Sequence, residues 1–275
     1  MSALRQFRHT LSKTSIRKPL LWMRHRGFHP SDAFVGSYPR SGSTWLRFIL
    51  VELLAGQDSG FSDVNRISPD VGDHAGARTL LAGGGRLIKT HEIYREAYRK
   101  AIYLVRDPRD VIFSEYAYYK ALGFAGDDFD EFLDEFLRKG VNPFGTWSHH
   151  AHSWLDAAES GKADILVVRF EDMRQDTQSA LGEMMEFLKV PVSASAIRAA
   201  VQHNSLDRMK AKEKVNPQKA SAKGRFIGSG SVQGWRDKLT DTQLGNIERH
   251  AGDAMRRLGY HLVSQEEQET SAVHA

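Results

Sequence analysis

The sequence predicts an α/β fold in which a central parallel sheet is flanked by helices. Short apolar stretches typical of buried strands occur at residues 33–36, 87–90, 101–105 and 165–169. Longer stretches with helical periodicity follow them, near residues 43–55, 108–121, 128–138, 147–160, 176–188, 193–202 and 240–258. Strands that alternate with helices in this order are typical of a parallel sheet joined by helical crossovers.

The composition fits one globular α/β domain that binds an anionic ligand. The chain has 275 residues, 41% of them hydrophobic, and a formal net charge of +4, and this length suits one large domain. Because no recognition motif accompanies the positive charge, we expect no nucleic-acid partner. The chain has no cysteine, which excludes a disulfide framework and a thiolate zinc site and suits the cytoplasmic location that we expect. No apolar run approaches the roughly 20 residues that span a bilayer.

We expect three segments: a basic N-terminal arm (1–31), the α/β domain (32–263) and a frayed polar tail (264–275). The arm contains seven Lys and Arg residues and no acidic residue, and Lys18-Pro19 interrupts its apolar residues, so a signal peptide is not expected. The apolar run Leu20–Met23 leaves open a weak contact with an anionic membrane surface. The oligomeric state is not predicted.

Residues 36–47 have the character of a phosphate-binding turn. An apolar strand leads into a Pro-Arg-Ser-Gly-Ser-Thr string, and the string opens an apolar helix. Backbone N–H groups and hydroxyls at a helix N-terminus bind anions, and here they would come from Ser41, Gly42, Ser43 and Thr44, with a fixed positive charge from Arg40. The alternative that the residues leave open is a capped helix, since Ser and Thr are common N-caps.

A second candidate anion site lies at residues 101–119. Arg106 ends an apolar strand, at the edge where parallel sheets bind ligands, and Ser114 lies eight residues later on the helix that Pro108 begins. The guanidinium and the hydroxyl can together bind a second phosphate. A surface pair between Arg106 and a neighbouring acid is the alternative, and such pairs contribute little to stability.

These two segments and three others resemble the sulfotransferase superfamily, in the order that the family has them. Tyr38 to Trp45 resembles its 5′-phosphosulfate loop, with Arg40 in place of the usual Lys, and the segment of Arg106 and Ser114 resembles its 3′-phosphate motif. The other three segments are Leu87 to His91, Phe170 to Met173 and Asn204 to Lys210. The resemblance runs from residue 33 to about residue 240 and implies a P-loop-like three-layer fold.

The resemblance implies transfer of a sulfuryl group from 3′-phosphoadenosine-5′-phosphosulfate (PAPS) to the hydroxyl of a small molecule or carbohydrate, without a metal. It makes His91 the general base and Lys89 the residue that assists the leaving group. Other donor-binding residues implied by it are Trp45, Phe170, Ser205, Leu206, Ser229 and Gly230. Gly228 stands where the family has an Arg for the 3′-phosphate, so we expect Lys223 and Arg225 to supply the charge.

Several other residue groups have simpler interpretations. We interpret His149, His150 and His152 as an exposed or acceptor-side cluster, because no acidic metal ligand lies in register with them. Glu171 is interpreted as structural, and Asp107 as a cap or ion-pair residue. The segments 56–86 and 210–234 are rich in Gly, Ser and charge and are predicted to be long loops. Segments 56–86 and 118–150 are expected to shape the acceptor pocket.

Two other functions remain open from the residues alone. A P-loop-type small-molecule kinase would share the sheet and a phosphate loop, but its motif needs a lysine directly after the second glycine, where this chain has Ser43. A non-enzymatic module that binds anionic glycans or a membrane would account for the basic N-terminus and the positive net charge.

Overall fold

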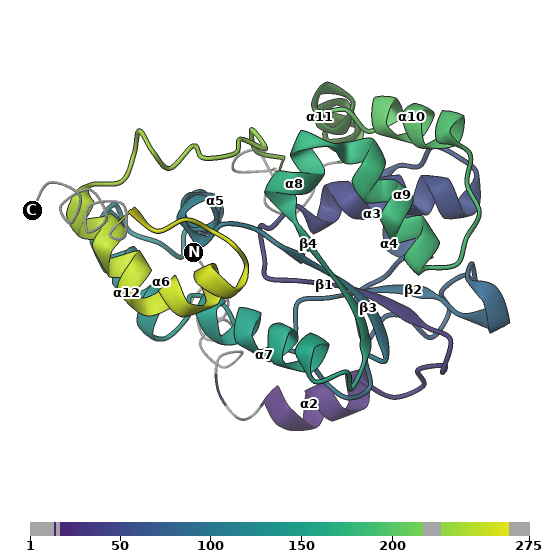
Figure 1. Cartoon of the computed structure of the whole chain (residues 1–275), viewed down its shortest axis with the longest axis horizontal. Helices are drawn as coiled ribbons and strands as arrows, with labels where there is room; N and C mark the ends of the chain where they lie inside the picture. Colours follow the sequence, from purple (N-terminus) through teal and green to yellow (C-terminus); the bar gives the residue numbers. More distant parts are fainter. Residues whose placement is uncertain (1–13, 15–16, 217–226, 264–275) are drawn as a thin grey trace, which may run out of the picture.

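A four-stranded parallel sheet forms the centre of the described part of the molecule (Figure 1). The computed structural model describes residues 14, 17–216 and 227–263. The strands β1 (Ala33–Ser37), β2 (Leu87–Thr90), β3 (Lys100–Val105) and β4 (Asp164–Arg169) lie in the order β2-β1-β3-β4. The predicted parallel sheet is thus confirmed, within one residue at each strand end.

The helices are close to the predicted ranges, with additional short helices between them. The N-terminal half contains α2 (Arg17–Arg24), α3 (Ser43–Ala55), α4 (Phe61–Ile67), the 3-10 turn η1 (Ala82–Gly84), α5 (Pro108–Leu122) and α6 (Phe129–Arg138). The C-terminal half contains α7 (Trp147–Glu159), α8 (Phe170–Gln175), α9 (Thr177–Phe187), α10 (Ala194–His203), α11 (Leu206–Val215) and α12 (Asp241–Arg257).

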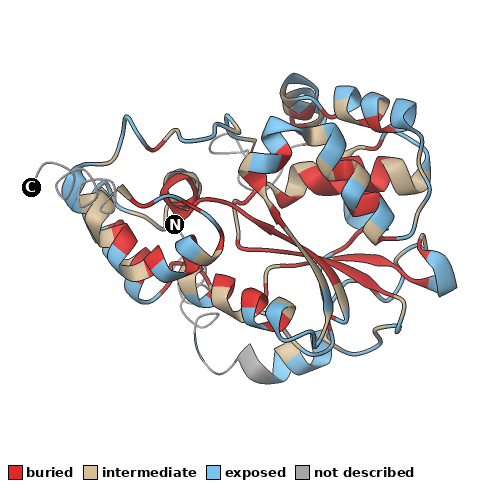
Figure 2. Ribbon diagram, in the orientation of Figure 1, coloured by how far each residue is buried: buried red, intermediate tan, exposed pale blue. Residues whose placement is uncertain are grey.

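Two layers of helices cover the sheet on opposite faces. α3 and α9 pack on one face with α10 beside them, and α7 packs on the other face with α6 and α12 beyond it. Figure 2 shows that β1, β2 and β3 are buried almost throughout, that β4 at the edge of the sheet is mostly half-buried, and that the outer sides of the helices are exposed. This is the three-layer arrangement that the sequence predicts.

The strand order places a ligand-binding crevice between β1 and β3. The chain leaves β1 through α3 on one face and leaves β3 through α5 to α7 toward the other. In open parallel sheets, a crevice forms at the carboxyl ends of the strands where the crossovers diverge in this way. The turn after β1 and the segment after β3, both predicted to bind anions, therefore lie side by side.

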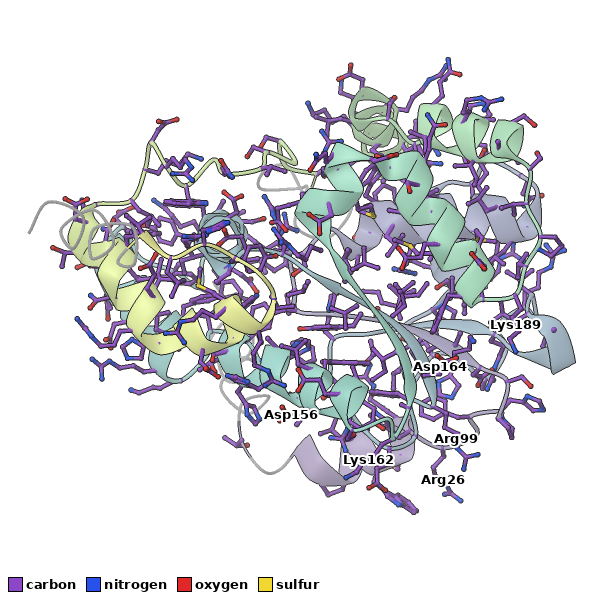
Figure 3. The ribbon with its side chains drawn as sticks, viewed as in Figure 1. Arg26, Arg99, Asp156, Lys162, Asp164 and Lys189 are labelled. Carbon is purple, nitrogen blue, oxygen red and sulfur yellow. The ribbon has the colours of Figure 1, made fainter. Side chains whose placement is uncertain are left out.

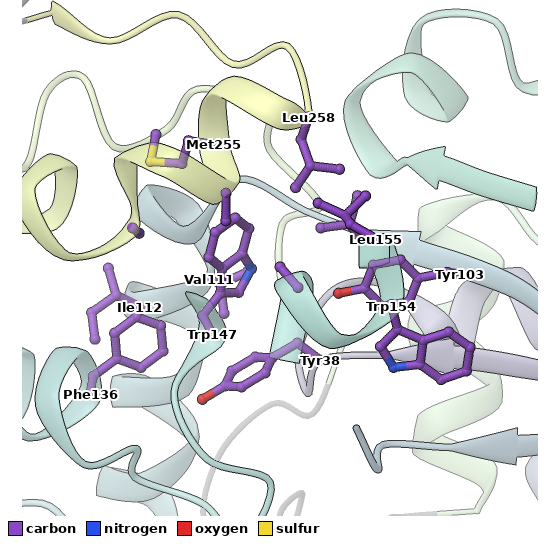
Figure 4. Packing of buried hydrophobic residues seen from close by; sticks show 14 of the residues in the cluster. Tyr38, Tyr103, Val111, Ile112, Phe136, Trp147, Trp154, Leu155, Met255 and Leu258 are labelled. Atoms are coloured by element: carbon purple, nitrogen blue, oxygen red, sulfur yellow. The ribbon is translucent and has the colours of Figure 1, made fainter. Parts of the chain in front are cut away.

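Aromatic side chains form much of the core between the sheet and α7. The ring of Trp154 on α7 stacks on Tyr103 of β3 at a centroid distance of 5.0 Å, as Figure 4 shows, and on Tyr98 at 5.7 Å. The close approach of Trp154 to β1 requires Gly36, because a Cβ at that position would lie 2.5 Å from the indole ring.

Two predicted loops contain helices. Residues 56–86 include α4 and η1, and α11 extends into residues 210–234. Phe61, Val64 and Ile67 of α4 are buried against Phe48 and Val51 of α3, so long-range packing stabilises a helix whose composition favours a loop. The predicted frayed tail 264–275 and part of the second loop lie outside the described residues.

Charged side chains gather at the amino ends of β3 and β4, at the end of the sheet opposite the crevice. Figure 3 shows Arg99, Lys162 and Asp164 together at this end. Lys100 Nζ lies 2.8 Å from a carboxylate oxygen of Asp164, an exposed pair of the kind that contributes little to stability.

We predict that Gly36→Ala destabilises the fold by about 1–3 kcal/mol, because the added methyl group overpacks the Trp154 ring. Thermal unfolding should show a lower Tm for Gly36→Ala. The decrease in Tm should be smaller when Gly36→Ala is made in a Trp154→Phe background. Gly245→Ala is the matched control, since no atom lies within 4 Å of the added Cβ on α12, and there a small gain in stability is expected. Equal effects of the two substitutions would contradict the packing argument.

Candidate active site

A cavity of about 600 Å³ opens at the carboxyl ends of the four strands. Its basic half is lined by Arg40, Gly42, Ser43, Thr44, Trp45, Arg106, Ser114 and Phe170. Its aromatic half is lined by Phe113, Ala117, Tyr118, Tyr119, Pro143 and Phe144. Lys89 and His91, at the end of β2, line the same cavity.

The turn between β1 and α3 has the open backbone of an anion-binding loop. Gly42 is the N-cap of α3 with a φ of 94°, and no side chain caps the helix there. A Cβ at Gly42 would lie 2.6 Å from the Phe170 ring, so both the backbone conformation and the packing require glycine. Arg40 also has a positive φ, of 64°, a conformation uncommon for a side chain of this size. The backbone is thus shaped to present the start of α3 to the cavity.

Arg106 connects the two candidate anion sites. Its Nη1 donates to the carbonyl of Arg40 at 3.3 Å, its Nη2 donates to the carbonyl of Ser231 at 2.9 Å, and its guanidinium lies 4.8 Å from the Phe170 ring. Arg40 Nε donates to the hydroxyl of Ser114 at 3.0 Å. The two candidate sites, whose bonded residues lie 66 and 74 positions apart in the sequence, are therefore in direct contact.

Two buried polar atoms here have no hydrogen-bond partner among the described residues: Arg106 Nε, whose side chain lines the cavity, and Ser41 Oγ in the turn, which is not among the lining residues. Such atoms are costly to leave unpaired. Asp110 lies 4.0 Å from Arg106 Nη2, while its Oδ2 accepts from the backbone N–H of Gln233 at 2.9 Å. The arrangement therefore has donors available for a bound anion.

His91 is held as one tautomer. Its Nδ1 lies 2.7 Å from the carbonyl oxygen of Ser37, which can only accept, so Nδ1 carries the proton and donates it. Nε2 is then the proton acceptor of the neutral ring. Burial, with the nearby charge of Lys89, lowers the pKa of His91 to about 3, and the ring is therefore neutral at pH 7.

Lys89 forms an ion pair with Asp70, at 2.9 Å between Nζ and Oδ1. Burial lowers the pKa of Lys89, and the Asp70 carboxylate opposes that effect. Burial alone would raise the pKa of Asp70, but the positive charges of Lys89 and Arg47 lower it to about 2. Asp70 is brought to Lys89 by a β-bridge between these two residues, a pairing that no local motif indicates.

Residues of the segment 56–86 do not line the larger cavity, and the expectation that this segment shapes the acceptor pocket stays a prediction. Phe61, Asn65 and Asp70 instead line a cavity of about 280 Å³ on the other side of Lys89. The physical reason is α4, whose apolar side chains hold the segment against α3 and away from the larger cavity.

Trp45 is positioned both to pack in the core and to contact a ligand. Its indole N–H donates to the carbonyl of Asn204 at 2.8 Å, and its ring meets Phe170 edge to face at 6.2 Å. The guanidinium of Arg174 lies 5.3 Å from the Trp45 ring. Arg174 also lines the cavity, although sequence reasoning did not select it; its place on α8, after β4, is the signal that could have found it.

The remaining predicted residues fall into three groups. Leu206, Ser229, Gly230 and also Gly228 line the cavity. Ser205 is exposed and is not among the lining residues, which disagrees with its expected place. Lys223 and Arg225 lie outside the described residues.

The interpretation of three histidines as one exposed or acceptor-side cluster is wrong for His150. Its ring is fully buried: Nε2 donates to the carbonyl of His91 at 3.2 Å, and Nδ1 accepts from the Tyr103 hydroxyl at 3.1 Å. Burial lowers the pKa of His150 to about 3. His149 is exposed, and Nδ1 of His152 lies 2.7 Å from Nη1 of Arg257. Residues adjacent on a helix face different directions, which separates the three rings.

The predicted structural roles of the acidic residues are confirmed. The Asp107 side chain accepts from the backbone N–H of Arg109 as the N-cap of α5. Glu171 accepts from the N–H of Asp107 at 3.0 Å and from the Tyr260 hydroxyl at 2.8 Å. These bonds tie α8 and the C-terminal segment to the start of α5, beneath the basic half of the cavity.

Sequence reasoning missed Glu115, a buried acid that lines the cavity. Its Oε1 accepts from Nδ2 of Asn142 at 3.0 Å. Burial raises the pKa of Glu115 to about 7, although Arg40 and Asn142 oppose the shift. Its position directly after Ser114 on a predicted helix was the available signal, but helix periodicity alone cannot show that an acid is buried.

Comparisons with known proteins agree on one family. The family model described as sulfotransferase domain matches residues 30–259. The chain is 31% identical over 244 residues to sulfotransferase 2B1 of Homo sapiens, covering 82% of this chain and 66% of that protein. It is 26% identical over 248 residues to sulfotransferase 1E1 of Rattus norvegicus, covering 80% and 82% respectively. The chain thus spans slightly under two thirds of the first relative and most of the second.

Solved structures share the fold. Mouse sulfotransferase SULT7A1 complexed with PAP has a TM-score of 0.65 at 23% identity, over 86% of this chain and 89% of that chain. Retinol dehydratase in a complex with retinol and PAP has a TM-score of 0.67 at 18% identity, over 85% and 83%. These likenesses support the predicted P-loop-like three-layer fold.

We predict that Glu115→Gln stabilises the protein increasingly as the pH rises from about 4.5 toward 8. A carboxyl whose pKa is raised in the folded state binds its proton more tightly there, so it costs stability once the pH passes its unfolded pKa. The increase in the free energy of unfolding should approach about 3 kcal/mol at most above pH 7 and vanish near pH 4. Urea unfolding at several pH values measures it, with the exposed Glu186→Gln on α9 as control. A gain independent of pH would contradict the assignment.

Proposed function

We propose that this chain, which belongs to the sulfotransferase family, transfers a sulfuryl group from PAPS to an acceptor hydroxyl. The observation that carries the proposal is the placement of His91 with its free Nε2 in the same cavity as the joined anion sites of Arg40 and Arg106. The family match over residues 30–259 supports the reaction class. Structures of the same fold determined with PAP support the nucleotide.

The basic half fits a doubly phosphorylated nucleotide. Ser41, Gly42, Ser43 and Thr44 at the start of α3, with Arg40, would hold the 5′ end. The Nε of Arg106 and the Ser114 hydroxyl would hold the 3′-phosphate, and the unpaired Arg106 Nε supports this assignment. Trp45, Phe170 and Leu206 would contact the base, since flat rings stack on nucleobases. When bound, PAPS supplies an activated sulfuryl group on a phosphate leaving group.

His91 would accept the acceptor's proton at Nε2 while the hydroxyl oxygen bonds to sulfur and the bond from sulfur to the phosphate oxygen breaks. Its proton on Nδ1 stays with the Ser37 carbonyl, which orients the ring. Lys89 would place positive charge on the leaving oxygen, the charge stabilisation that lowers a barrier most. Asp70 holds the Lys89 ammonium at 2.9 Å and thus positions it.

The two alternatives differ in what they require. A kinase would need a lysine after Gly42, and the structure has Ser43 there, at the first position of α3. A membrane-contacting arm has some support in α2, where Leu20, Trp22 and Met23 are exposed; within the described residues, no helix is long and apolar enough to cross a membrane. This surface contact, the cytoplasmic location and the division of the chain into arm, domain and tail stay predictions.

We predict that the purified protein transfers label from radiolabelled PAPS to members of a hydroxyl library and that His91→Ala lowers kcat by about 10²–10⁴-fold, the usual contribution of a general base. PAP should still bind this variant. The exposed His149→Ala on α7 is the matched control. A wild-type protein that transfers no label to any acceptor would refute the proposed reaction.

We predict that Arg106→Ala weakens PAP binding by about 10- to 150-fold, because each lost hydrogen bond to a charged group contributes about 1.5–3 kcal/mol. Isothermal titration calorimetry measures the change. Arg249→Ala, an exposed position on α12, should leave the affinity within twofold. Unchanged affinity in Arg106→Ala would remove this residue from the 3′-phosphate site.

A further inference from the structure

Glu115 is one of two acidic side chains that line the cavity, the other being Asp110, and this inference rests on the proposed function and concerns the aromatic half of the cavity. Phe113, Ala117 and Tyr118 of α5 and Phe144 of the opposite segment form its wall. Glu115, which lines the same space, is 1% exposed. A buried carboxylate in an apolar wall costs stability unless a partner compensates it, so its presence requires an explanation.

The hydrogen bonding of Glu115 is incomplete. Its Oε1 accepts one bond, from Nδ2 of Asn142 at 3.0 Å. This is the hydrogen bond that the described part of the structure provides to the carboxylate. A carboxylate can accept about four hydrogen bonds. Arg40 acts on Glu115 through its charge, while Arg40 Nε donates to Ser114. Glu115 can therefore still accept hydrogen bonds from a molecule in the cavity.

The segment 142–144 links Glu115 to the candidate base. The N–H of Phe144 donates to Oδ1 of Asn142 at 2.9 Å, and the Phe144 ring lies 5.6 Å from the His91 ring. Asn142 thus bonds Glu115 through Nδ2 and the backbone N–H of Phe144 through Oδ1. The segment 142–144 therefore contacts both Glu115 and His91, which line the same cavity.

We propose that Glu115 is a specificity-determining residue that accepts a hydrogen bond from a second donor group on the acceptor, a hydroxyl or an ammonium group. The reacting hydroxyl lies at Nε2 of His91, the apolar ring of the acceptor packs between Phe144 and α5, and the second donor reaches Glu115. The acceptor class is therefore a ring-bearing alcohol or phenol with at least two donor groups. Apolar pockets with a few placed polar groups bind ligands in this manner.

The other reading of Glu115 is that it only balances the charge of Arg40. The two interpretations predict different effects of removing the Glu115 side chain. If Glu115 serves Arg40, its removal changes the affinity for PAP and leaves the discrimination between acceptors as it was. If Glu115 contacts the acceptor, its removal abolishes the discrimination, because a site built to hydrogen-bond a group rejects analogues that lack it.

Three matched phenols test the proposal on the full chain saturated with PAP: 4-ethylphenol, its hydroxyl analogue 4-(2-hydroxyethyl)phenol, and its amine analogue tyramine. Isothermal titration calorimetry gives the dissociation constants for wild type, Glu115→Leu and Glu115→Gln. We expect wild type to bind at least one donor-bearing phenol at least about tenfold more tightly than 4-ethylphenol. This ratio should fall to about one in Glu115→Leu and stay unchanged in the control Glu186→Leu, an exposed position on α9.

The Glu115→Gln variant separates the two donor groups and covers the case in which Glu115→Leu does not fold. A preference for the ammonium group should be lost in Gln, and a preference for the hydroxyl should be reduced severalfold, because the amide oxygen accepts a weaker, uncharged bond. Equal binding of the three phenols to wild type, no binding of any, or a ratio that survives both substitutions would overturn the proposal. Failure of wild type to bind PAP would instead refute the proposed function.

Discussion

The ring of Phe170 contacts both segments of the candidate anion site. On one side it contacts Gly42, where a Cβ would be only 2.6 Å away, and on the other the Arg106 guanidinium lies over it at 4.8 Å. Trp45 meets its edge. The turn after β1, the segment after β3 and the helix after β4 thus meet at one side chain, which fixes Gly42 and Arg106 relative to each other.

The second constraint is electrostatic. Arg40, Arg106 and Lys89 gather at one end of a sheet, where burial disfavours charge. Asp70 compensates Lys89 at 2.9 Å and Asp110 lies 4.0 Å from Arg106, but the Arg106 Nε stays unpaired among the described residues. A buried cluster of cations with an unpaired donor destabilises the fold. The same cluster suits the binding of an anion, which would accept the hydrogen bond that Arg106 Nε does not make within the protein.

His91 and His150 show how neighbouring imidazoles take different roles. Both are neutral at pH 7 because burial lowers their pKa values. His150 uses both nitrogens within the protein, toward Tyr103 and the carbonyl of His91, and so supports the backbone that carries His91. The Nδ1 of His91 bonds the Ser37 carbonyl, which directs the lone pair of Nε2 to other partners. The two rings therefore differ in their hydrogen-bond partners, because different groups surround them.

Local sequence signals were sufficient to predict some of the elements. Apolar runs predicted all four strands, turn chemistry predicted the start of α3, and ordered motifs predicted the residues around His91 and Arg106, because propensity, periodicity and spacing are properties of neighbouring residues. Other features depend on contacts between distant segments. α4 forms because α3 offers it an apolar surface, Asp70 reaches Lys89 through a bridge between distant segments, and Glu115 is buried opposite Asn142. Burial and long-range pairing depend on which surfaces meet, and no local pattern encodes that.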